Sequence, residues 1–262
     1  LYENEWNLRK ANNSLNFGYT TNYTAGKGKG QTKVNYRTSG FLSDYDYDYV
    51  TVENKLNFRL KKFRLKTRLF LFGGLGASWA PESMLYLAGS NPENISENKF
   101  TRAEGVFDKS SAIFGDRINT FHAGGGLNLR GFAGYLAPEQ IGNTQYATYK
   151  GTNGASINLE LEFDNYLGIN NLFWRKYINI KTYAFADAGI IDIYKSDENL
   201  TFSKPRADAG LGMALTIKKF YRLNAVKPFT IRADFPLLLN RVPNVNPDFF
   251  KYRWIIGINR AF

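Results

Sequence analysis

The sequence predicts an all-β fold, an antiparallel transmembrane β-barrel, and three observations support this prediction. The composition favours strands and turns, with 17 Tyr, 21 Phe and 24 Gly among 262 residues. Apolar and polar residues alternate along several segments, which gives each expected strand one apolar and one polar face. Many of these segments run to about ten residues, the length that a tilted strand needs to cross a bilayer.

Composition alone favours a soluble β-sandwich. The mean hydropathy is -0.38, and no stretch approaches the roughly 18 apolar residues of a membrane helix. A transmembrane barrel is compatible with that value, because only alternate residues face lipid while the lumen is polar. The length of the segments and the dense charges of both signs on their polar faces favour the barrel.

Charge and residue usage argue against several functions. The net charge of +11 suits nucleic acid, but Lys and Arg are spread along the expected strands and do not gather in one stripe, which argues against nucleic-acid binding. The absence of Cys excludes disulfides and thiolate catalysis, and a single His excludes a His-rich metal site. Asp44, Asp46 and Asp48 lack the Gly and the terminal Glu of a calcium loop. His122 has no nucleophile and base beside it. We therefore expect no enzymatic activity, no metal and no cofactor.

Alternation predicts roughly ten strands. In chain order they are expected at about 3–10, 14–24, 31–42, 49–60, 63–78, 156–166, 177–192, 206–218, 228–238 and 252–262. Lys61-Lys62 predicts a tight hairpin turn, and the glycines of residues 26–30 predict another. The chain shows no linker, so residues 1–262 are expected to form one barrel domain.

The alternation is clearest between Ile157 and Phe163, where every odd residue is apolar and every even residue is polar. Three other strands carry charged or polar residues on one face: Arg64, Lys66 and Arg68; Asn179, Lys181 and Asp187; and Thr230, Arg232 and Asp234. Both signs of charge recur on neighbouring faces, which predicts an interior held by ion pairs. Aromatic residues near segment ends fit interfacial girdles, namely Tyr166, Trp174, Tyr177, Tyr252 and Trp254.

Between about 80 and 155 the alternation gives way to Pro, Asn, Ser and Gly. A connection of this length is uncommon and more often has a function than serves only to join two strands. It contains two neighbouring glycines followed by Arg130-Gly131-Phe132, and Phe185-Ala186-Asp187-Ala188-Gly189 follows later in an expected strand. This pair of motifs resembles the hallmark of the BamA/TamA superfamily of outer-membrane insertases and translocases. In that family the Arg lies on the sixth extracellular loop, which folds back into the barrel and docks on the strand motif.

The spacing of the strand motif makes physical sense by itself. Phe185, Asp187 and Gly189 lie at i, i+2 and i+4, so all three share one face. Gly189 leaves room for a loop, and the carboxylate of Asp187 matches the planar fork of a guanidinium. We therefore expect an Arg130–Asp187 pair that holds the long loop inside the barrel.

The resemblance covers about residues 63–262, whereas residues 1–62 match only as generic strands. The family ends five strands after its sixth loop, and five are expected here. Trp254, Gly257 and the terminal Phe262 resemble the C-terminal signal by which new barrels are recognised for insertion, although Arg260 stands where that signal usually has an apolar residue. The family barrel has sixteen strands, so the resemblance implies that further strands, and any periplasmic POTRA domains, precede Leu1.

The resemblance implies an integral protein of a Gram-negative outer membrane that assists insertion of β-barrel proteins or translocation of polypeptide. Its implied partners are outer-membrane lipid and lipopolysaccharide, client polypeptides, and periplasmic or lipoprotein accessory subunits. Residues 252–262 would form one side of a lateral seam that opens for client strands. Two alternatives stay open: a barrel that anchors an upstream soluble enzyme domain, and a passive channel narrowed by the long loop.

Overall fold

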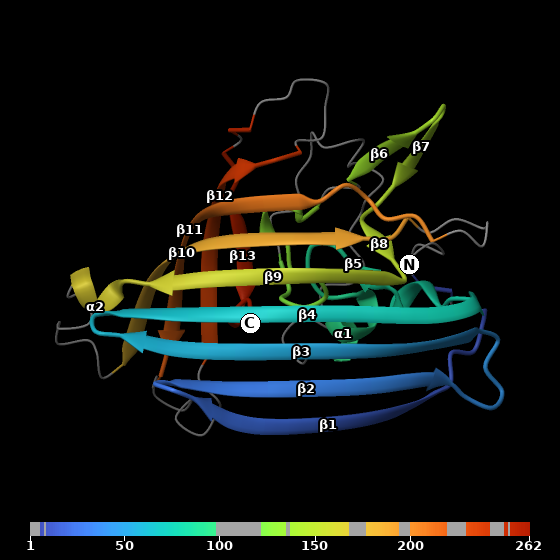
Figure 1. Cartoon of the computed structure of the whole chain (residues 1–262), viewed down its shortest axis with the longest axis horizontal. Helices are drawn as coiled ribbons and strands as arrows, with labels where there is room; N and C mark the ends of the chain where they lie inside the picture. Colours follow the sequence, from blue (N-terminus) through green and yellow to red (C-terminus); the bar gives the residue numbers. More distant parts are fainter. Residues whose placement is uncertain are drawn as a thin grey trace.

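The computed structural model describes residues 6–7, 9–97, 122–134, 137–167, 177–193, 200–218, 229–241, 249–250 and 252–262. Its main element is a nine-stranded antiparallel sheet in the order β1-β2-β3-β4-β9-β10-β11-β12-β13 (Figure 1). These strands are β1 (Ser14–Ala25), β2 (Gly28–Ser39), β3 (Asp46–Leu60), β4 (Phe63–Ser78), β9 (Asn153–Glu162), β10 (Ile178–Ile191), β11 (Arg206–Ile217), β12 (Phe229–Leu239) and β13 (Ile255–Ile258). Strands that follow one another along the chain are therefore neighbours, with one long connection between β4 and β9.

The prediction of an antiparallel all-β fold is confirmed, and each of these nine strands begins within three residues of its expected start. The strand expected at 3–10 is wrong where the structure describes it, because Trp6, Asn7, Arg9 and Lys10 are not in a strand. Both hairpin turns are present, at Gly26-Lys27 and at Lys61-Lys62, where Gly26 and Lys61 have φ of 56° and 51°. As expected, five strands of the sheet follow the long connection.

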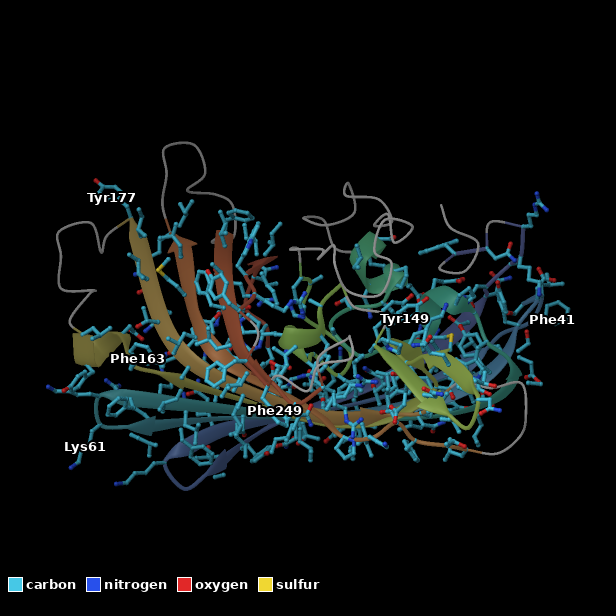
Figure 2. The ribbon with its side chains drawn as sticks, turned by 90° about the horizontal axis from the view of Figure 1, so that it is seen from above. Phe41, Lys61, Tyr149, Phe163, Tyr177 and Phe249 are labelled. Carbon is cyan, nitrogen blue, oxygen red and sulfur yellow. The ribbon has the colours of Figure 1, made fainter. Side chains whose placement is uncertain are left out.

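The sheet is strongly curved but open in the described part of the chain. Its edges are β1 and β13, and these two strands do not pair with each other. The expected closed barrel is thus not observed in these nine strands. The two ends of the sheet differ: Lys61 and Phe163 lie at one end, and Phe41 lies at the other, where the long connection also begins (Figure 2).

The long connection carries short elements of its own. They are η1 (Pro81–Ser83), β5 (Leu85–Tyr86), α1 (Pro92–Glu97), η2 (Arg130–Phe132), β6 (Pro138–Ile141), β7 (Thr144–Ala147) and β8 (Lys150–Gly151). β5 pairs with β8, and β6 with β7. A further short helix, α2 (Asp164–Leu167), follows β9. The expectation of a loop without strands is corrected here, because strands of two to four residues are too short for alternation to reveal them. No helix in the described part is long and apolar enough to cross a membrane.

The connection packs against the concave face of the sheet (Figures 1 and 2). Leu127, Leu129 and Phe132 from the connection share one buried apolar cluster with Phe70 and Phe72 of β4. Burial of these side chains gives the connection a fixed position, since apolar surface removed from water is the main favourable term in packing.

The sheet exposes apolar side chains on one face and buries polar ones on the other, which is the reverse of the pattern in a soluble protein. Exposed apolar side chains follow its convex face, including Leu15, Phe17, Tyr19, Tyr36, Val50, Leu69, Leu71, Ile157, Leu161, Leu211, Met213, Ile231 and Ile256. Buried charged or polar side chains follow its concave face, including Arg68, Asn158, Glu160, Glu162, Asp187, Arg206, Asp208, Arg232 and Asp234. The register of the strands places each row on one face. Charged residues are seldom fully buried in soluble proteins unless they are paired.

Candidate functional site: the Arg130 site on the concave face

The segment before Arg130 turns sharply and brings the arginine onto the sheet. Gly126 and Asn128 have φ of 52° and 60°, and η2 begins two residues after Asn128. Left-handed backbone of this kind favours glycine and asparagine. The pair of glycines in the motif thus serves the turn, and Arg130 is directed at β9 and β10.

Arg130 is fully buried and forms the predicted pair with Asp187. Its Nε donates to Asp187 Oδ2 at 2.8 Å and its Nη2 donates to Asp187 Oδ1 at 3.0 Å. The backbone N–H of Arg130 also donates to Asp187 Oδ2, at 3.3 Å. A bidentate contact of a guanidinium with a carboxylate is among the stronger hydrogen-bonded pairs. We call Arg130, Asp187 and Glu160 the Arg130 site.

Glu160 is the member of the site that the sequence did not single out for this role. Its Oε1 accepts from Arg130 Nη1 at 2.8 Å, and both side chains are fully buried. Burial disfavours a charged guanidinium, but Asp187 and Glu160 outweigh this effect and raise the pKa of Arg130. The arginine is therefore a cation held between two carboxylates from adjacent strands.

The other residues of the two motifs make the close approach possible. Phe185 lies beneath the arginine, with its ring centre 4.0 Å from Arg130 Cζ. A Cβ added at Gly189 would lie 2.8 Å from Ala155 O and 3.0 Å from Leu129 Cδ1, so this glycine does leave room for the loop. A Cβ added at Gly131 would lie 2.5 Å from the Cβ of Asp208, so the glycine in the loop likewise allows the loop backbone to approach β11 closely.

Phe132 completes the loop motif on its apolar side. It is 1% exposed and belongs to the buried cluster that joins the connection to β4. The Arg206 guanidinium lies 5.6 Å from its ring centre. Each residue of Arg130-Gly131-Phe132 thus has a separate contact: an ion pair, a backbone approach and an apolar anchor.

Side chains of the sheet also bind the backbone carbonyls of the loop, which the sequence did not predict. Arg68 donates to Gly126 O at 2.9 Å, and Asn158 donates to the carbonyls of residues 127 and 128 at 3.2 and 3.1 Å. Arg253 donates to the carbonyls of residues 131 and 133. These bonds satisfy polar groups that burial would otherwise leave without water.

His122 ties the start of the described loop segment to the last strands. Its backbone N–H donates to Ile256 O at 2.8 Å, and its side-chain Nδ1 and its backbone carbonyl accept from Arg232. Burial, followed by the nearby Arg232, Arg130 and Arg253, lowers the pKa of His122 well below its ordinary value. The imidazole is therefore neutral, as an acceptor for a guanidinium must be.

The C-terminal residues that resemble an insertion signal lie in two environments. Trp254 is 47% exposed, whereas Gly257 pairs with Arg232, and a Cβ added there would lie 2.7 Å from the guanidinium. Phe262 lies on the concave side, with its ring centre 5.9 Å from Arg130 Cζ. A signal role for these residues stays a prediction.

The expected last strand at 252–262 is too long. β13 ends at Ile258, and Asn259 has a φ of 64°, which turns the last residues onto the concave face. There Arg260 pairs with Glu160 and, at 3.0 Å, with Glu162. Arg260 thus joins the network around the Arg130 site.

The described residues contain no group of three or more His, Asp or Glu with metal-binding geometry. Asp44 instead accepts from the backbone N–H of Ala11 at 2.7 Å. The Arg130 site consists of paired charges and contacts with the loop backbone. Such an arrangement can hold the loop in one position.

No protein-family model matches the chain, and no curated protein matches it. The resemblance to the BamA/TamA superfamily therefore rests on the two motifs and stays a prediction.

Proposed function

We propose that this chain is part of an integral β-barrel of a Gram-negative outer membrane, of the BamA/TamA type, which assists insertion of barrel proteins or translocation of polypeptide. The observation that carries the proposal is the Arg130 site. A loop motif and a strand motif, far apart in the sequence, meet in a fully buried bidentate pair in the order that the family resemblance implies.

The inverted burial of the sheet supports the membrane part of the proposal. The apolar row on the convex face suits contact with lipid, and the buried charges suit a lumen closed by the folded-back loop. Backbone groups at membrane depth must be paired, which a closed barrel achieves. Both edges of the sheet, β1 and β13, therefore need partner strands in the membrane. An edge that accepts a strand is also what insertion of a client requires.

Insertion activity can be measured with vesicles that contain the protein. The folding rate of an unfolded outer-membrane barrel client is compared in these vesicles and in empty vesicles of the same lipid. We expect faster client folding with the wild-type chain and little acceleration with Arg130→Ala, because the loop loses its position. Arg64→Ala serves as the matched control, since Arg64 pairs with Glu162 at 3.3 Å but is one-third exposed.

A passive channel is the second candidate, and one observation favours it. A polar cavity of 530 Å³ borders β2, β3 and β4, and its lining includes Lys33, Glu53 and Arg68. A channel predicts steady ion conductance across a planar bilayer and no acceleration of client folding. Low, erratic conductance together with faster client folding supports the insertase. If the chain inserts into the membrane but shows neither conductance nor acceleration of client folding, the result favours the third reading, a membrane anchor for another domain.

A further inference from the structure

The long connection is attached to the sheet at a second place, away from the Arg130 site. Arg37 lies near the end of β2, at the end of the sheet where Phe41 lies (Figure 2), and Glu93 lies in the first turn of α1. Arg37 Nη1 donates to Glu93 Oε2 at 2.5 Å, and Arg37 Nη2 donates to Glu93 Oε1 at 2.8 Å. The arginine is only 5% exposed, so this contact is a second bidentate ion pair that is largely withdrawn from water.

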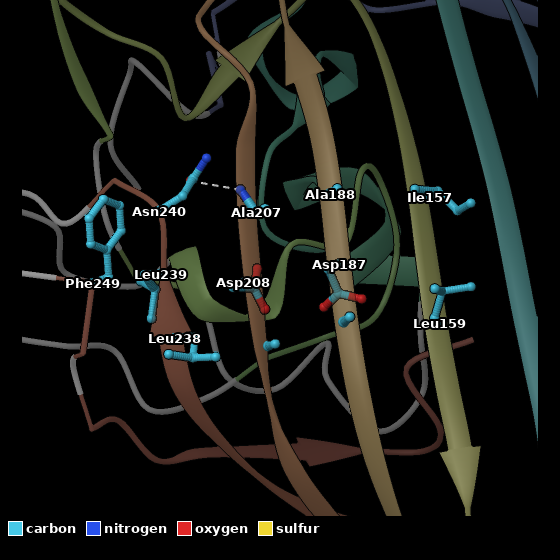
Figure 3. Close-up of a pocket in the computed structure, with 12 residues that line it drawn as sticks. Ile157, Leu159, Asp187, Ala188, Ala207, Asp208, Leu238, Leu239, Asn240 and Phe249 are labelled. Carbon is cyan, nitrogen blue, oxygen red and sulfur yellow. Dashed lines mark hydrogen bonds between the residues drawn. The ribbon is translucent and has the colours of Figure 1, made fainter.

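The two attachments have opposite charges. At the Arg130 site the connection supplies the cation, and the sheet supplies Asp187, which lies on β10 with Asp208 beside it on β11 (Figure 3). In the second pair the sheet supplies the cation, Arg37, and the connection supplies the carboxylate of Glu93. Because exchanging the two contacts would bring like charges together, the pairs fix which part of the connection lies on which half of the sheet.

Polar side chains from three other segments fix the carboxylate of Glu93. Its Oε2 also accepts from Ser83 Oγ at 3.0 Å. Ser83 Oγ accepts from Asn12 Nδ2 at 3.0 Å, and Tyr47 Oη donates to Asn12 Oδ1 at 2.7 Å. Ser83 and Tyr47 are fully buried. A buried network of this kind positions an ion pair far better than an exposed surface contact does.

Apolar contacts hold α1 less firmly than they hold the segment around Arg130. Leu127, Leu129 and Phe132 anchor that segment in the buried apolar cluster. Of the six residues of α1, only Pro92 is buried. Since burial of apolar surface is the main favourable term in packing, the contact of α1 with the sheet depends chiefly on its ion pair with Arg37.

The same helix forms one side of the polar cavity. Glu93, Asn94 and Glu97 line the cavity from α1, whereas Lys33 and Thr51 line it from β2 and β3. A displacement of α1 away from β2 would therefore enlarge the cavity and uncover the inward side chains of the first strands.

We propose that α1 is a movable cover of the polar cavity, that the Arg37–Glu93 pair holds this cover closed, and that the cover opens while the Arg130 site stays docked. Segments with little apolar burial open locally at a lower free energy than the whole fold. The apolar anchors of residues 127–132 keep the remainder of the connection in place. The cover controls access to the cavity from the end of the sheet that carries the connection, which goes beyond the proposed function and applies equally to a channel.

Cysteine labelling tests this proposal, because the chain contains no Cys. Thr51→Cys places a reporter in the cavity. Ser156→Cys places a second reporter on β9 beneath the docked loop, where Ser156 is 4% exposed and a Cβ added at Gly189 would meet both Ser156 Cβ and Leu129 Cδ1. Each reporter is introduced separately into the folded chain in detergent micelles, and its rate of reaction with a maleimide is measured.

Glu93→Gln should raise the labelling rate of Thr51→Cys about tenfold or more, because a hydrogen-bonded ion pair is lost. The labelling rate of Ser156→Cys should not change. Glu97→Gln is the matched control, since it removes the same charge from an exposed position of the same helix and should alter neither rate. The double variant Arg37→Glu/Glu93→Arg should bring the labelling rate of Thr51→Cys back toward the wild-type value, which a variant that had merely lost packing would not do.

Two results would overturn the proposal. One is an unchanged labelling rate of Thr51→Cys in both Glu93→Gln and Arg37→Ala. The other is equal acceleration at Thr51→Cys and Ser156→Cys, because the connection would then leave the sheet as one unit. The measurement uses no client protein and no bilayer, so its outcome is separate from those of the insertion and conductance measurements.

Discussion

The concave face differs between the two halves of the sheet. Along β9, β10 and β12 the inward side chains are covered by the long connection, and Asn158, Glu160, Tyr183 and Asp234 are fully buried. Along the middle of β2 and β3 the inward row borders the polar cavity instead, and Lys33 is exposed within it, whereas at one end of these strands Arg37 and Tyr47 are buried under the connection, where Arg37 pairs with Glu93 of α1. β1 is exposed over most of its length on both faces, with Phe17 and Tyr19 at 60% and 67% exposure.

The same alternation of polar and apolar residues therefore has two energetic consequences. A charge that borders a cavity keeps much of its hydration, whereas a charge under a docked loop loses it and needs a partner. In the second half of the sheet the loop supplies that partner as Arg130. The loop is thus a structural component of the part of the sheet formed by β9 to β12, whereas the cavity leaves the middle of β2 and β3 accessible.

Arg130→Ala should have the largest effect on stability. It leaves Asp187 and Glu160 buried without their shared cation, and removing one partner of a buried pair costs about 3–5 kcal/mol. The free energy of unfolding can be measured by urea titration of the chain in lipid vesicles, with tryptophan fluorescence as the signal. Arg64→Ala, at the rim of the same face, should cost less than about 1 kcal/mol, because its pair is partly exposed. Similar losses of unfolding free energy for the two variants would mean that the docked loop does not stabilise the part of the sheet formed by β9 to β12.

Gly189→Ala should have an intermediate effect. The added methyl group meets Ala155 O and Leu129 Cδ1 at 3.0 Å or less, so the loop must shift, and overpacking of this kind costs roughly 1–3 kcal/mol. Limited proteolysis of residues 122–134 measures the docking of the loop directly, and cleavage should become faster. Gly73→Ala is the matched control on β4, where the nearest atom to the added Cβ is Asn153 Oδ1 at 4.0 Å. Unchanged proteolysis in both variants would contradict the close fit at Gly189.

Much of the fold could be predicted because alternation is a local signal. Nine strands and both hairpin turns were found in this way, and Arg130 could be matched to Asp187 because both lie in short motifs. Of the strand expected at 3–10, the described residues Trp6, Asn7, Arg9 and Lys10 lie outside any strand, because alternation over a few residues does not by itself specify a pairing. The short strands β5 to β8 failed because pairs of two to four residues depend on the packing of the connection and have no period of their own.

Residues whose role depends on register could not be predicted. Asn158 and Glu160 were recognised as the polar face of a strand, but only the pairing of β9 with β10 places them beside Asp187 and Phe185. Arg253 and Arg260 likewise lie far from the loop in sequence and reach it only because β13 borders β12 and the chain then turns inward. Sequence therefore locates the two motifs, while the network that supports them is a property of the folded sheet.

Arg260→Ala should have the smallest effect of the three changes on the concave face. Glu160 keeps Arg130, and Glu162 keeps Lys66 at 2.7 Å, so neither carboxylate becomes unpaired. Because Arg260 is 21% exposed, we expect a loss of about 1 kcal/mol, measured by the same urea titration. Lys33→Ala, in the cavity of the other half, should change stability by no more than about 0.5 kcal/mol. A loss of unfolding free energy for Arg260→Ala as large as that for Arg130→Ala would contradict this ranking. It would show that the inward-turned C-terminus stabilises the docked loop as much as the Arg130 site does.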